Sequence, residues 1–226
     1  MQIARFPVIF QPFSEKLIPK NFRKGAKHME LRNSQTFQNL INAFAGESQA
    51  HIRYKFLAYA AKQQKLCEVE KAIKVLEENE FNHARMFYTA IQSAGSETFV
   101  NLQVNAGYPF KEKWDFLKNF DFAIENETEE NTKIYPQFSK TARDEGLVNI
   151  ADLFDLVSAV EACHAKQLTE LRDHIKNGTL YNRPQPVKWK CAYCGHEEVL
   201  TTAWEVCPLC KAQQGDVMLN LAGTTN

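Results

Sequence analysis

Glycine and proline are scarce in this chain, with 9 and 8 among 226 residues. This scarcity argues against a many-turned β-sandwich and favours long helices. An excess of charge of one sign is also missing, because 27 Lys and Arg residues balance 27 Asp and Glu residues. A neutral chain is not drawn to polyanions by bulk charge, and no stretch reaches the ~20 apolar residues of a membrane span. We therefore expect neither a nucleic-acid partner nor a membrane.

Cysteines are few as well: six are present, and four of them lie between 191 and 210. The other two, Cys67 and Cys163, stand alone in helical patterns, where free cysteine usually serves as a small apolar packing residue. This distribution is typical of a metal-binding knuckle and not of a disulfide framework. It predicts a reducing compartment, which we take to be the cytoplasm.

The first 28 residues show no helical or strand pattern and are basic, with Glu15 as their single acidic residue. An organelle-targeting segment has this composition, although the longest apolar run is too short for a secretory signal. The other reading is an added tail, or a start assigned too early with Met29 as the working one. We favour that reading and place residues 1–32 outside the folded core.

Hydrophobic periodicity predicts four long helices, near 34–64, 67–94, 112–145 and 147–177. Their ends carry glycine stop signals at Gly95, Gly146 and Gly178. About 17 residues separate the second helix from the third, which is enough to run the length of a bundle. Four helices with one long crossover are typical of the ferritin-like fold.

The expected organisation is therefore mainly α, with a ferritin-like four-helix bundle followed by a small metal ribbon. The bundle is predicted over 33–178 and the ribbon over 188–222. Pro184 and Pro186 lie between them, and residues 179–187 are expected to form a stiff linker.

Acidic and histidine residues interrupt the apolar stripes at repeated positions: Glu47, Glu80-x-x-His83, Glu127-x-x-Glu130 and Glu161-x-x-His164. Glu47 and Glu80 are 33 residues apart, Glu127 and Glu161 are 34 apart, and the midpoint of each pair falls on a predicted turn. Residues equidistant from the turn of a helical hairpin lie at the same height, so the four carboxylates are expected to meet inside one bundle. A spacing of three residues aims each Glu and His from one helix face.

Glu-x-x-His also occurs by chance, and the acidic run 125–130 would by itself be a solvated face. Two copies at matched depth in apolar stripes favour a metal site instead, because an unpaired buried carboxylate costs several kcal/mol. Five carboxylates leave a charge of −1 with two divalent ions and +1 with two trivalent ions, so the site straddles neutrality across a redox change. Carboxylate and imidazole ligands suit iron first and manganese second.

Two cysteine knuckles, Cys191-x-x-Cys194 and Cys207-x-x-Cys210, are separated by twelve residues. Four thiolates at this spacing form a tetrahedral site for iron or for zinc. One interpretation is a zinc ribbon, in which the ion stabilises the fold of a segment too short to form its own hydrophobic core. The redox site upstream favours the other, a one-iron centre that relays single electrons. Three aromatic residues are expected to pack around the knuckles: Trp189, Tyr193 and Trp204.

Residues 33–222 resemble the rubrerythrin family. The resemblance is carried by the segment AFAGESQA at 43–50, the step Glu80-x-x-His83-Ala84, the pair Tyr135-Pro136 after Glu127-x-x-Glu130, and the rubredoxin-like knuckles. It implies a di-iron centre in which Glu80 and Glu161 bridge the two irons. Glu47 would bind one iron, and Glu127 with His164 would bind the other.

The resemblance also implies that the first iron exchanges Glu130 for His83 between the oxidised and reduced states. Tyr54 and Tyr135 match tyrosines that hydrogen-bond ligating carboxylates and so hold their orientation. The expected activity is reduction of hydrogen peroxide to water, with electrons relayed through the rubredoxin-like iron and with neither haem nor flavin. The electrons would come from an external reductase that uses NAD(P)H, or from a rubredoxin.

The predicted fourth helix runs 13 residues beyond His164, about 20 Å at 1.5 Å per residue. The chain's own ribbon thus begins far from its own di-iron site, and the ribbon of a neighbouring subunit is a better donor. This agrees with the head-to-tail homodimer that the resemblance implies.

Two other functions stay open at this point. A ferroxidase or other iron-handling bundle would use the same ligands beside a structural zinc ribbon, but it has no evident need of a tetrathiolate. A helical scaffold would leave five interior carboxylates without a reason. His51, one turn beyond Glu47, is expected to be a packing or surface residue.

Overall fold

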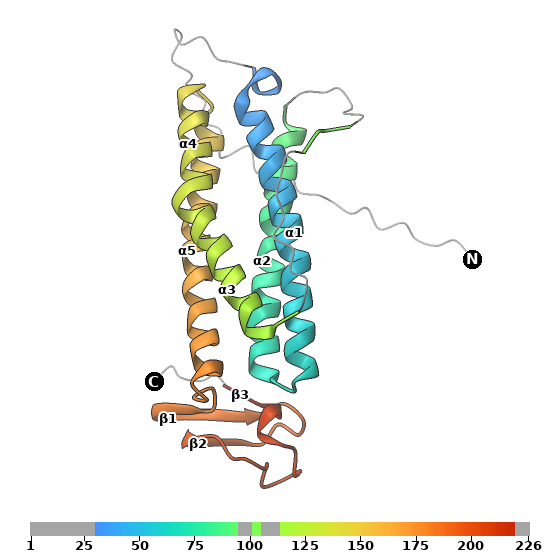
Figure 1. Ribbon diagram of the computed structural model, residues 1–226, viewed down its shortest axis with the longest axis vertical. Helices are drawn as coiled ribbons and strands as arrows, with labels where there is room; N and C mark the ends of the chain where they lie inside the picture. The colour runs from blue at the N-terminus through green and yellow to red at the C-terminus, as the bar shows by residue number, and fades with distance from the viewer. Residues whose placement is uncertain (1–29, 95–100, 105–113, 220–226) are drawn as a thin grey trace, which may run out of the picture.

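The computed structural model describes residues 30–94, 101–104 and 114–219 of the chain. They form a bundle of long helices with a small three-stranded ribbon at one end (Figure 1). The predicted tail at 1–28, the stop at Gly95 and most of the crossover lie outside the described residues. Within those residues, no helix is long and apolar enough to cross a membrane.

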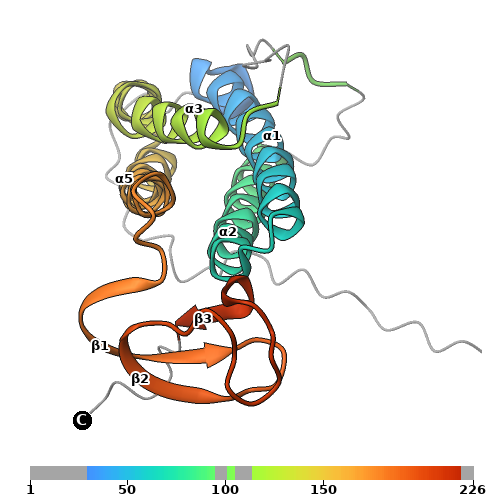
Figure 2. The same cartoon turned by 60° about the horizontal axis from the view of Figure 1, so that its bottom comes forward.

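The bundle consists of two helical hairpins. The first pairs α1 (Gln35–Gln63) with α2 (Cys67–Gln92), and the second pairs α3 (Phe116–Glu129) and α4 (Tyr135–Asp144) with α5 (Val148–Lys176). The hairpins lie side by side in both views (Figures 1 and 2). The mainly helical, ferritin-like architecture predicted from the periodicity is confirmed.

Local signals explain where the helices begin and turn. Ser34 caps α1 by accepting a hydrogen bond from the Phe37 amide, and Asp115 caps α3 by accepting one from the Lys118 amide at 2.8 Å. Gly146 has a φ of +79° in the turn before α5, a conformation that glycine adopts without steric cost. The predicted helix ends therefore agree with the observed ones to within a few residues, except at the start of α3.

The core forms two apolar clusters, one toward each end of the bundle. The cluster near the ribbon contains Leu76 of α2 and Leu168 of α5. The cluster at the far end contains Phe87 of α2 and Phe154 of α5. All four are essentially inaccessible to solvent, and burying each such side chain contributes about 1.5–3 kcal/mol. The layer between the two clusters holds the polar residues that interrupt the stripes.

The third predicted helix is not a single α-helix. A π-turn, η3 (Glu130–Ile134), separates α3 from α4, and the Tyr135 amide bonds to the Glu130 carbonyl five residues earlier. Pro136 follows directly; it cannot donate a backbone hydrogen bond, and its ring disfavours the regular α-helical ladder before it. The prediction of an unbroken helix over 112–145 was therefore wrong at this turn.

The π-turn also restores the helix face. Glu127 and Tyr135 are eight residues apart, and at about 100° per residue a regular helix would put them roughly 80° from each other. The π-turn accommodates one extra residue, so the angle between the two side chains is that of residues seven apart in a regular helix, about 20°. Both side chains are buried. In the first hairpin the equivalent pair, Glu47 and Tyr54, is seven residues apart in a continuous helix.

The ribbon has strand order β2-β1-β3, with β1 (Asn182–Cys191) antiparallel to both β2 (Glu197–Thr202) and β3 (Val217–Leu219). Trp189 is fully buried and donates its Nε1 hydrogen bond to the Leu200 carbonyl at 3.0 Å. Trp204 packs partly against this small core. Tyr193 does not, since 81% of it is exposed, so the expected packing is wrong for that residue.

The linker expected over 179–187 is instead folded. Leu180 is buried in the core cluster of the bundle that lies nearer the ribbon, and β1 begins at Asn182. The register of β1 and β2 breaks between Asn182 and Val187. Pro184 and Pro186 lie in that irregular stretch, where a strand tolerates residues that cannot donate to the ladder.

The ribbon docks on the turn between α1 and α2 (Figure 2). The Leu219 amide donates to the Glu68 carboxylate at 3.0 Å, and Tyr181 packs against both the bundle core and the ribbon core. Gly215 approaches so closely that a Cβ there would lie 2.0 Å from the Lys65 carbonyl oxygen. Bundle and ribbon thus meet through specific contacts and not through a free tether.

Candidate metal centres

The layer between the two apolar clusters contains four buried glutamates and two buried histidines. Each glutamate comes from a different long helix, and α2 and α5 each add a histidine one turn later: Glu47 on α1, Glu80 and His83 on α2, Glu127 on α3, Glu161 and His164 on α5. The structure therefore brings together six of the seven predicted ligands in the bundle.

These residues form two overlapping groups. One contains Glu47, Glu80, His83 and Glu161, and the other contains Glu80, Glu127, Glu161 and His164. Within each group one ligand atom per residue lies within 4.8 Å of all the others. Glu80 and Glu161 belong to both groups, which is the arrangement expected of carboxylates that bridge two ions.

The distances show which oxygen faces which group. The Nδ1 atom of His83 lies 2.9 Å from Oε1 of Glu161 and 3.4 Å from Oε2 of Glu80. The Nδ1 atom of His164 lies 2.7 Å from Oε2 of Glu161 and 2.9 Å from Oε1 of Glu80. Each shared glutamate thus turns one oxygen toward each histidine.

The inward-facing atoms contact one another, but none of these contacts has the geometry of a hydrogen bond. Eight buried atoms of these six residues are unpartnered in the described part of the chain: Glu47 Oε2, Glu80 Oε1 and Oε2, His83 Nδ1, Glu127 Oε2, Glu161 Oε1 and Oε2, and His164 Nδ1. Unpartnered buried polar atoms are costly, and eight in one layer require a common partner. Hard carboxylate oxygens and imidazole nitrogens fit iron or manganese ions as that partner.

The titration behaviour shows that the pocket attracts positive charge. Burial opposes the charged form of both histidines, but the surrounding carboxylates outweigh it and raise the pKa of His83 and of His164 to about 12. Burial also opposes ionisation of Glu80, yet the close contacts of its oxygens with the His164 and His83 imidazoles hold its pKa below the ordinary value. Protons on the two imidazoles thus take the place that metal ions would occupy.

Two buried tyrosines orient the outer carboxylates. The Tyr54 hydroxyl donates to Oε1 of Glu127, and the Tyr135 hydroxyl donates to Oε1 of Glu47. Burial and the adjacent carboxylate charge raise the pKa of both tyrosines well above the ordinary value. Both therefore keep their protons and stay donors, which leaves the Oε2 atom of each glutamate facing the site.

Glu130 belongs to neither group of ligands. It lies in the π-turn, and its Oε1 atom is 3.9 Å from the position that a Cβ on Gly46 would take. Burial and the negative charges of Glu161 and Glu80 raise the pKa of Glu130 to about 8. The structure thus holds Glu130 at the edge of the site, with His83 inside it.

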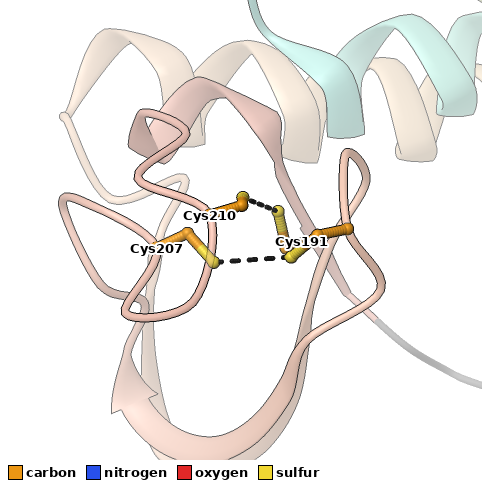
Figure 3. Close-up of side chains that lie close together, drawn as sticks. Cys191, Cys207 and Cys210 are labelled. Carbon is orange, nitrogen blue, oxygen red and sulfur yellow. Dashed lines mark hydrogen bonds between the residues drawn. The ribbon is translucent and has the colours of Figure 1, made fainter.

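The four cysteines of the ribbon converge (Figure 3). Sγ of Cys191 lies 3.7 Å from Sγ of Cys210, and Sγ of Cys194 lies 3.7 Å from Sγ of Cys207. A tetrahedron with metal–sulfur bonds of about 2.3 Å has edges of about 3.8 Å, so one ion of iron or zinc fits. Burial opposes ionisation of Cys207, but backbone amides of Cys210 and Leu209 outweigh it and lower its pKa to about 6.

Four residues outside these clusters complete the account. His51 contacts the Glu77 carbonyl through Nδ1 at 2.9 Å and joins neither group. Cys67 is partly buried, whereas Cys163 is exposed and does not fill the core as expected. Asn79, which the sequence reasoning missed, lies 3.2 Å from Nε2 of His164. The only sequence signal for Asn79 is its place directly before Glu80.

A helical bundle with a buried layer of carboxylates and histidines, joined to a four-cysteine ribbon, defines the class of ferritin-like carboxylate proteins with a rubredoxin-like appendage. The chain belongs to the rubrerythrin family, whose model matches residues 38–175. It is 36% identical over 180 residues to Rubrerythrin-1 of Clostridium acetobutylicum, covering 80% of this chain and 91% of that protein.

Other relatives agree with this placement. Rubrerythrin of Porphyromonas gingivalis is 31% identical over 192 residues, covering 85% of this chain and 93% of that protein. A solved structure of nigerythrin in a partially reduced state matches with a TM-score of 0.54 and 20% identity, covering 88% of this chain and all of that one. At that identity the likeness supports the fold alone. The carboxylate and cysteine clusters fit iron binding in this family.

Proposed function

We propose that this protein is a non-haem di-iron peroxidase, an oxidoreductase that reduces hydrogen peroxide to water in defence against oxidative stress. The observation that carries the proposal is the set of eight unpartnered ligand atoms in two overlapping groups. The presence of a four-cysteine site in the same chain adds a route for single electrons.

In this proposal Glu80 and Glu161 would be shared between the two iron ions, Glu47 and His83 would complete one site, and Glu127 and His164 would complete the other. Glu130 would be the alternative ligand to His83 in the oxidised state. A pair of ferrous ions would supply the two electrons that convert one peroxide and two protons into two waters. Neither haem nor flavin is needed.

The surrounding residues position the ligands and hold protons. Tyr54 and Tyr135 fix the outer carboxylates, and the apolar clusters above and below exclude bulk water. In the metal-free site, burial and the charges of Glu161 and Glu80 raise the pKa of Glu130 to about 8, so its carboxyl keeps a proton there at neutral pH. We propose Glu130 as a proton donor at the edge of the site while His83 holds the metal, because peroxide reduction consumes protons.

The ribbon is proposed as the electron relay, with its cysteines holding iron. Glu68, which anchors β3, is 12 residues before Glu80 on α2, about 18 Å at 1.5 Å per residue. The chain's own tetrathiolate thus lies at the end of the bundle, one long helix segment from the site. We propose that a second subunit, arranged head to tail, brings its ribbon closer, and that an external NAD(P)H-dependent reductase or a rubredoxin supplies electrons.

The test is anaerobic stopped-flow absorbance of the fully reduced protein mixed with hydrogen peroxide, with metal content measured on the same sample. We expect rapid oxidation of the di-iron site, followed by oxidation of the tetrathiolate iron when peroxide is in excess. A Cys207→Ser variant is expected to lose the second phase only, and Cys163→Ser, an exposed cysteine outside both sites, is expected to keep both phases.

The alternative is a ferroxidase with a structural zinc ribbon, which the tetrahedral sulfur geometry accommodates equally well. Zinc in the ribbon, together with oxidation by peroxide no faster than by oxygen, would replace the peroxidase proposal with iron handling. Sedimentation of the loaded protein tests the dimer separately, because a monomer would remove the head-to-tail arrangement.

A further inference from the structure

Asn79 links α2 to the histidine of the facing helix. Its side-chain amide nitrogen lies 3.2 Å from Nε2 of His164 on α5. The opposite ring nitrogen, Nδ1, faces Glu161 and Glu80 at 2.7 and 2.9 Å. The imidazole is therefore held at both ends, by the ligand layer on one side and by Asn79 on the other.

The chemistry of a histidine ligand fixes what Asn79 must do. A neutral imidazole that binds metal through Nδ1 carries its proton on Nε2 and needs an acceptor there. A carboxamide has a donor arm and an acceptor arm of nearly the same shape, so a half-turn of the Asn79 amide presents its oxygen to that proton. We propose that Asn79 is a positioning residue that fixes the tautomer and ring orientation of His164, and thereby sets metal affinity in the half-site containing Glu127.

The two histidines differ in this respect. His83 and His164 are stacked with ring centroids 5.7 Å apart. All polar contacts of His83 within the described part of the chain run through Nδ1, to Glu47, Glu80 and Glu161, and its Nε2 atom has no such partner there. The His164 ring is thus held at Nε2 by Asn79, and the His83 ring has no such contact within the described residues. The anchored half-site is the one expected to keep its histidine, while His83 is free to turn away.

Asn79 also lines a cleft of about 540 Å³, together with Val75 and Cys67 of α2 and Met218 of β3. A shorter side chain at position 79 would leave space beside Nε2 of His164 for a water molecule, which would supply an acceptor in place of the amide. A leucine of similar size is therefore the sharper substitution, because it removes the acceptor without admitting water.

The experiment uses the full chain with zinc bound to the four cysteines and titrates Co²⁺ into the bundle. For Asn79→Leu we expect one of the two cobalt affinities to fall about ten- to a hundredfold while the other stays within about twofold. Asn79→Asp, which keeps an acceptor, is expected to retain both affinities. Asn82→Leu is the matched control, since Asn82 is partly buried and its side chain, among the described residues, bonds only to Glu78 and Arg85 of the same helix.

A second readout does not depend on affinity. In the zinc-loaded parent chain labelled with ¹⁵N-histidine, His164 is expected to carry a proton on Nε2 that exchanges slowly with solvent. In Asn79→Leu this proton is expected to exchange faster. Unchanged affinities in Asn79→Leu, with an Nε2 proton that exchanges as slowly as in the parent chain, would overturn the inference. So would an equal fall at both half-sites, or a fall of the same size in Asn82→Leu. The inference rests on the two-metal site of the proposed function but not on peroxide chemistry, so a failed peroxidase assay leaves this test intact.

Discussion

The Tyr54 hydroxyl of α1 donates to the Glu127 carboxylate of α3, and the reciprocal bond runs from Tyr135 of α4 to Glu47 of α1. Each helical hairpin therefore supplies the tyrosine that orients the outer carboxylate of the other hairpin. The two bonds cross the bundle in the layer where the ligand atoms meet. Assembly of the bundle and orientation of its ligands are thus the same event.

Tyr54→Phe is expected to weaken metal binding at the Glu127 half-site by about ten- to a hundredfold, because the carboxylate loses the donor that fixes its rotamer. The metal-free protein is expected to lose about 1–3 kcal/mol of unfolding free energy, since the buried Glu127 carboxyl oxygen is left without its donor. Metal titration and urea denaturation measure the two effects. Tyr59→Phe is the control, because Tyr59 is exposed, and equal effects in both variants would contradict the prediction.

Glu145, in the turn between α4 and α5, caps the first turn of α1. It accepts hydrogen bonds from the amides of Gln35 and Thr36 and from the Thr36 hydroxyl, at 2.6 to 2.9 Å. Burial opposes ionisation of Glu145, but the bonds from Thr36 and Gln35 outweigh it and lower its pKa. A lowered folded-state pKa means that the stabilisation is complete above the ordinary value of 4.5 and is lost as the pH falls below it through the folded-state value.

Glu145→Gln is therefore expected to cost about 1 kcal/mol of unfolding free energy near neutral pH, the usual scale for loss of a helix cap. The difference from the parent chain is expected to shrink as the pH falls below about 4.5. Denaturation at a series of pH values checks this. Asp144→Asn is the neighbouring control, because within the described part of the chain Asp144 pairs only with exposed Lys140. A difference that grows on acidification would refute the assignment.

Gly215→Ala is expected to separate the ribbon from the bundle without changing the four-cysteine site. The added Cβ would meet the backbone of the α1–α2 turn at Lys65, which cannot move aside as a flexible side chain would. Hydrogen exchange at the Leu219 amide, which bonds to Glu68, is expected to accelerate. Protection of that amide equal to the parent's would show that the turn adapts.

Removal of metal from the ribbon is expected to unfold the ribbon while the bundle stays helical. The ribbon core consists mainly of Trp189, Ala203 and Val217, too little apolar area to fold alone, so binding energy at the four thiolates is folding energy. Far-ultraviolet circular dichroism reports the helices, and tryptophan fluorescence of a Trp114→Phe background reports the two ribbon tryptophans, Trp189 and Trp204. A ribbon that kept Trp189 buried after chelation, or in Cys207→Ser, would contradict this.

Loading the bundle with two divalent ions is expected to release at least two protons, because the imidazoles of His83 and His164 must give up theirs to bind. The pKa values of both imidazoles are raised to about 12. Burial also raises the pKa of Glu47 and of Glu127 well above the ordinary value, so their carboxyls add to the release. In the metal-free protein, the ion pairs of the two imidazolium groups therefore stabilise the fold fully below pH 6.5, the ordinary pKa of histidine. This stabilisation is lost only as the pH rises through about 12. Metal affinity should fall as the pH falls, and a pH indicator in weak buffer measures the release. Metal uptake without proton release would contradict this account.

The sequence by itself determined the four helices, the depth of the ligand layer and the cysteine cluster. Apolar spacing sets which helix faces are buried, and equal distances from two turns bring Glu47 opposite Glu80 and Glu127 opposite Glu161. These features depend on spacing within one helix or on equal distances from a turn, so both can be read directly from the residue numbers. The Cys-x-x-Cys spacing likewise needs only the short turn of each knuckle.

Tertiary structure alone decided the remaining features, because each depends on contacts between segments far apart in the chain. Glu145 caps a helix that begins 110 residues earlier, and Asn79 meets His164 across 85 residues. The apolar pattern across the π-turn before Tyr135 is that of a single continuous helix. One extra residue changes the direction of a side chain but hardly changes the apolar spacing. The predicted linker became strand β1 because it pairs with β2, a partner that its own prolines do not reveal.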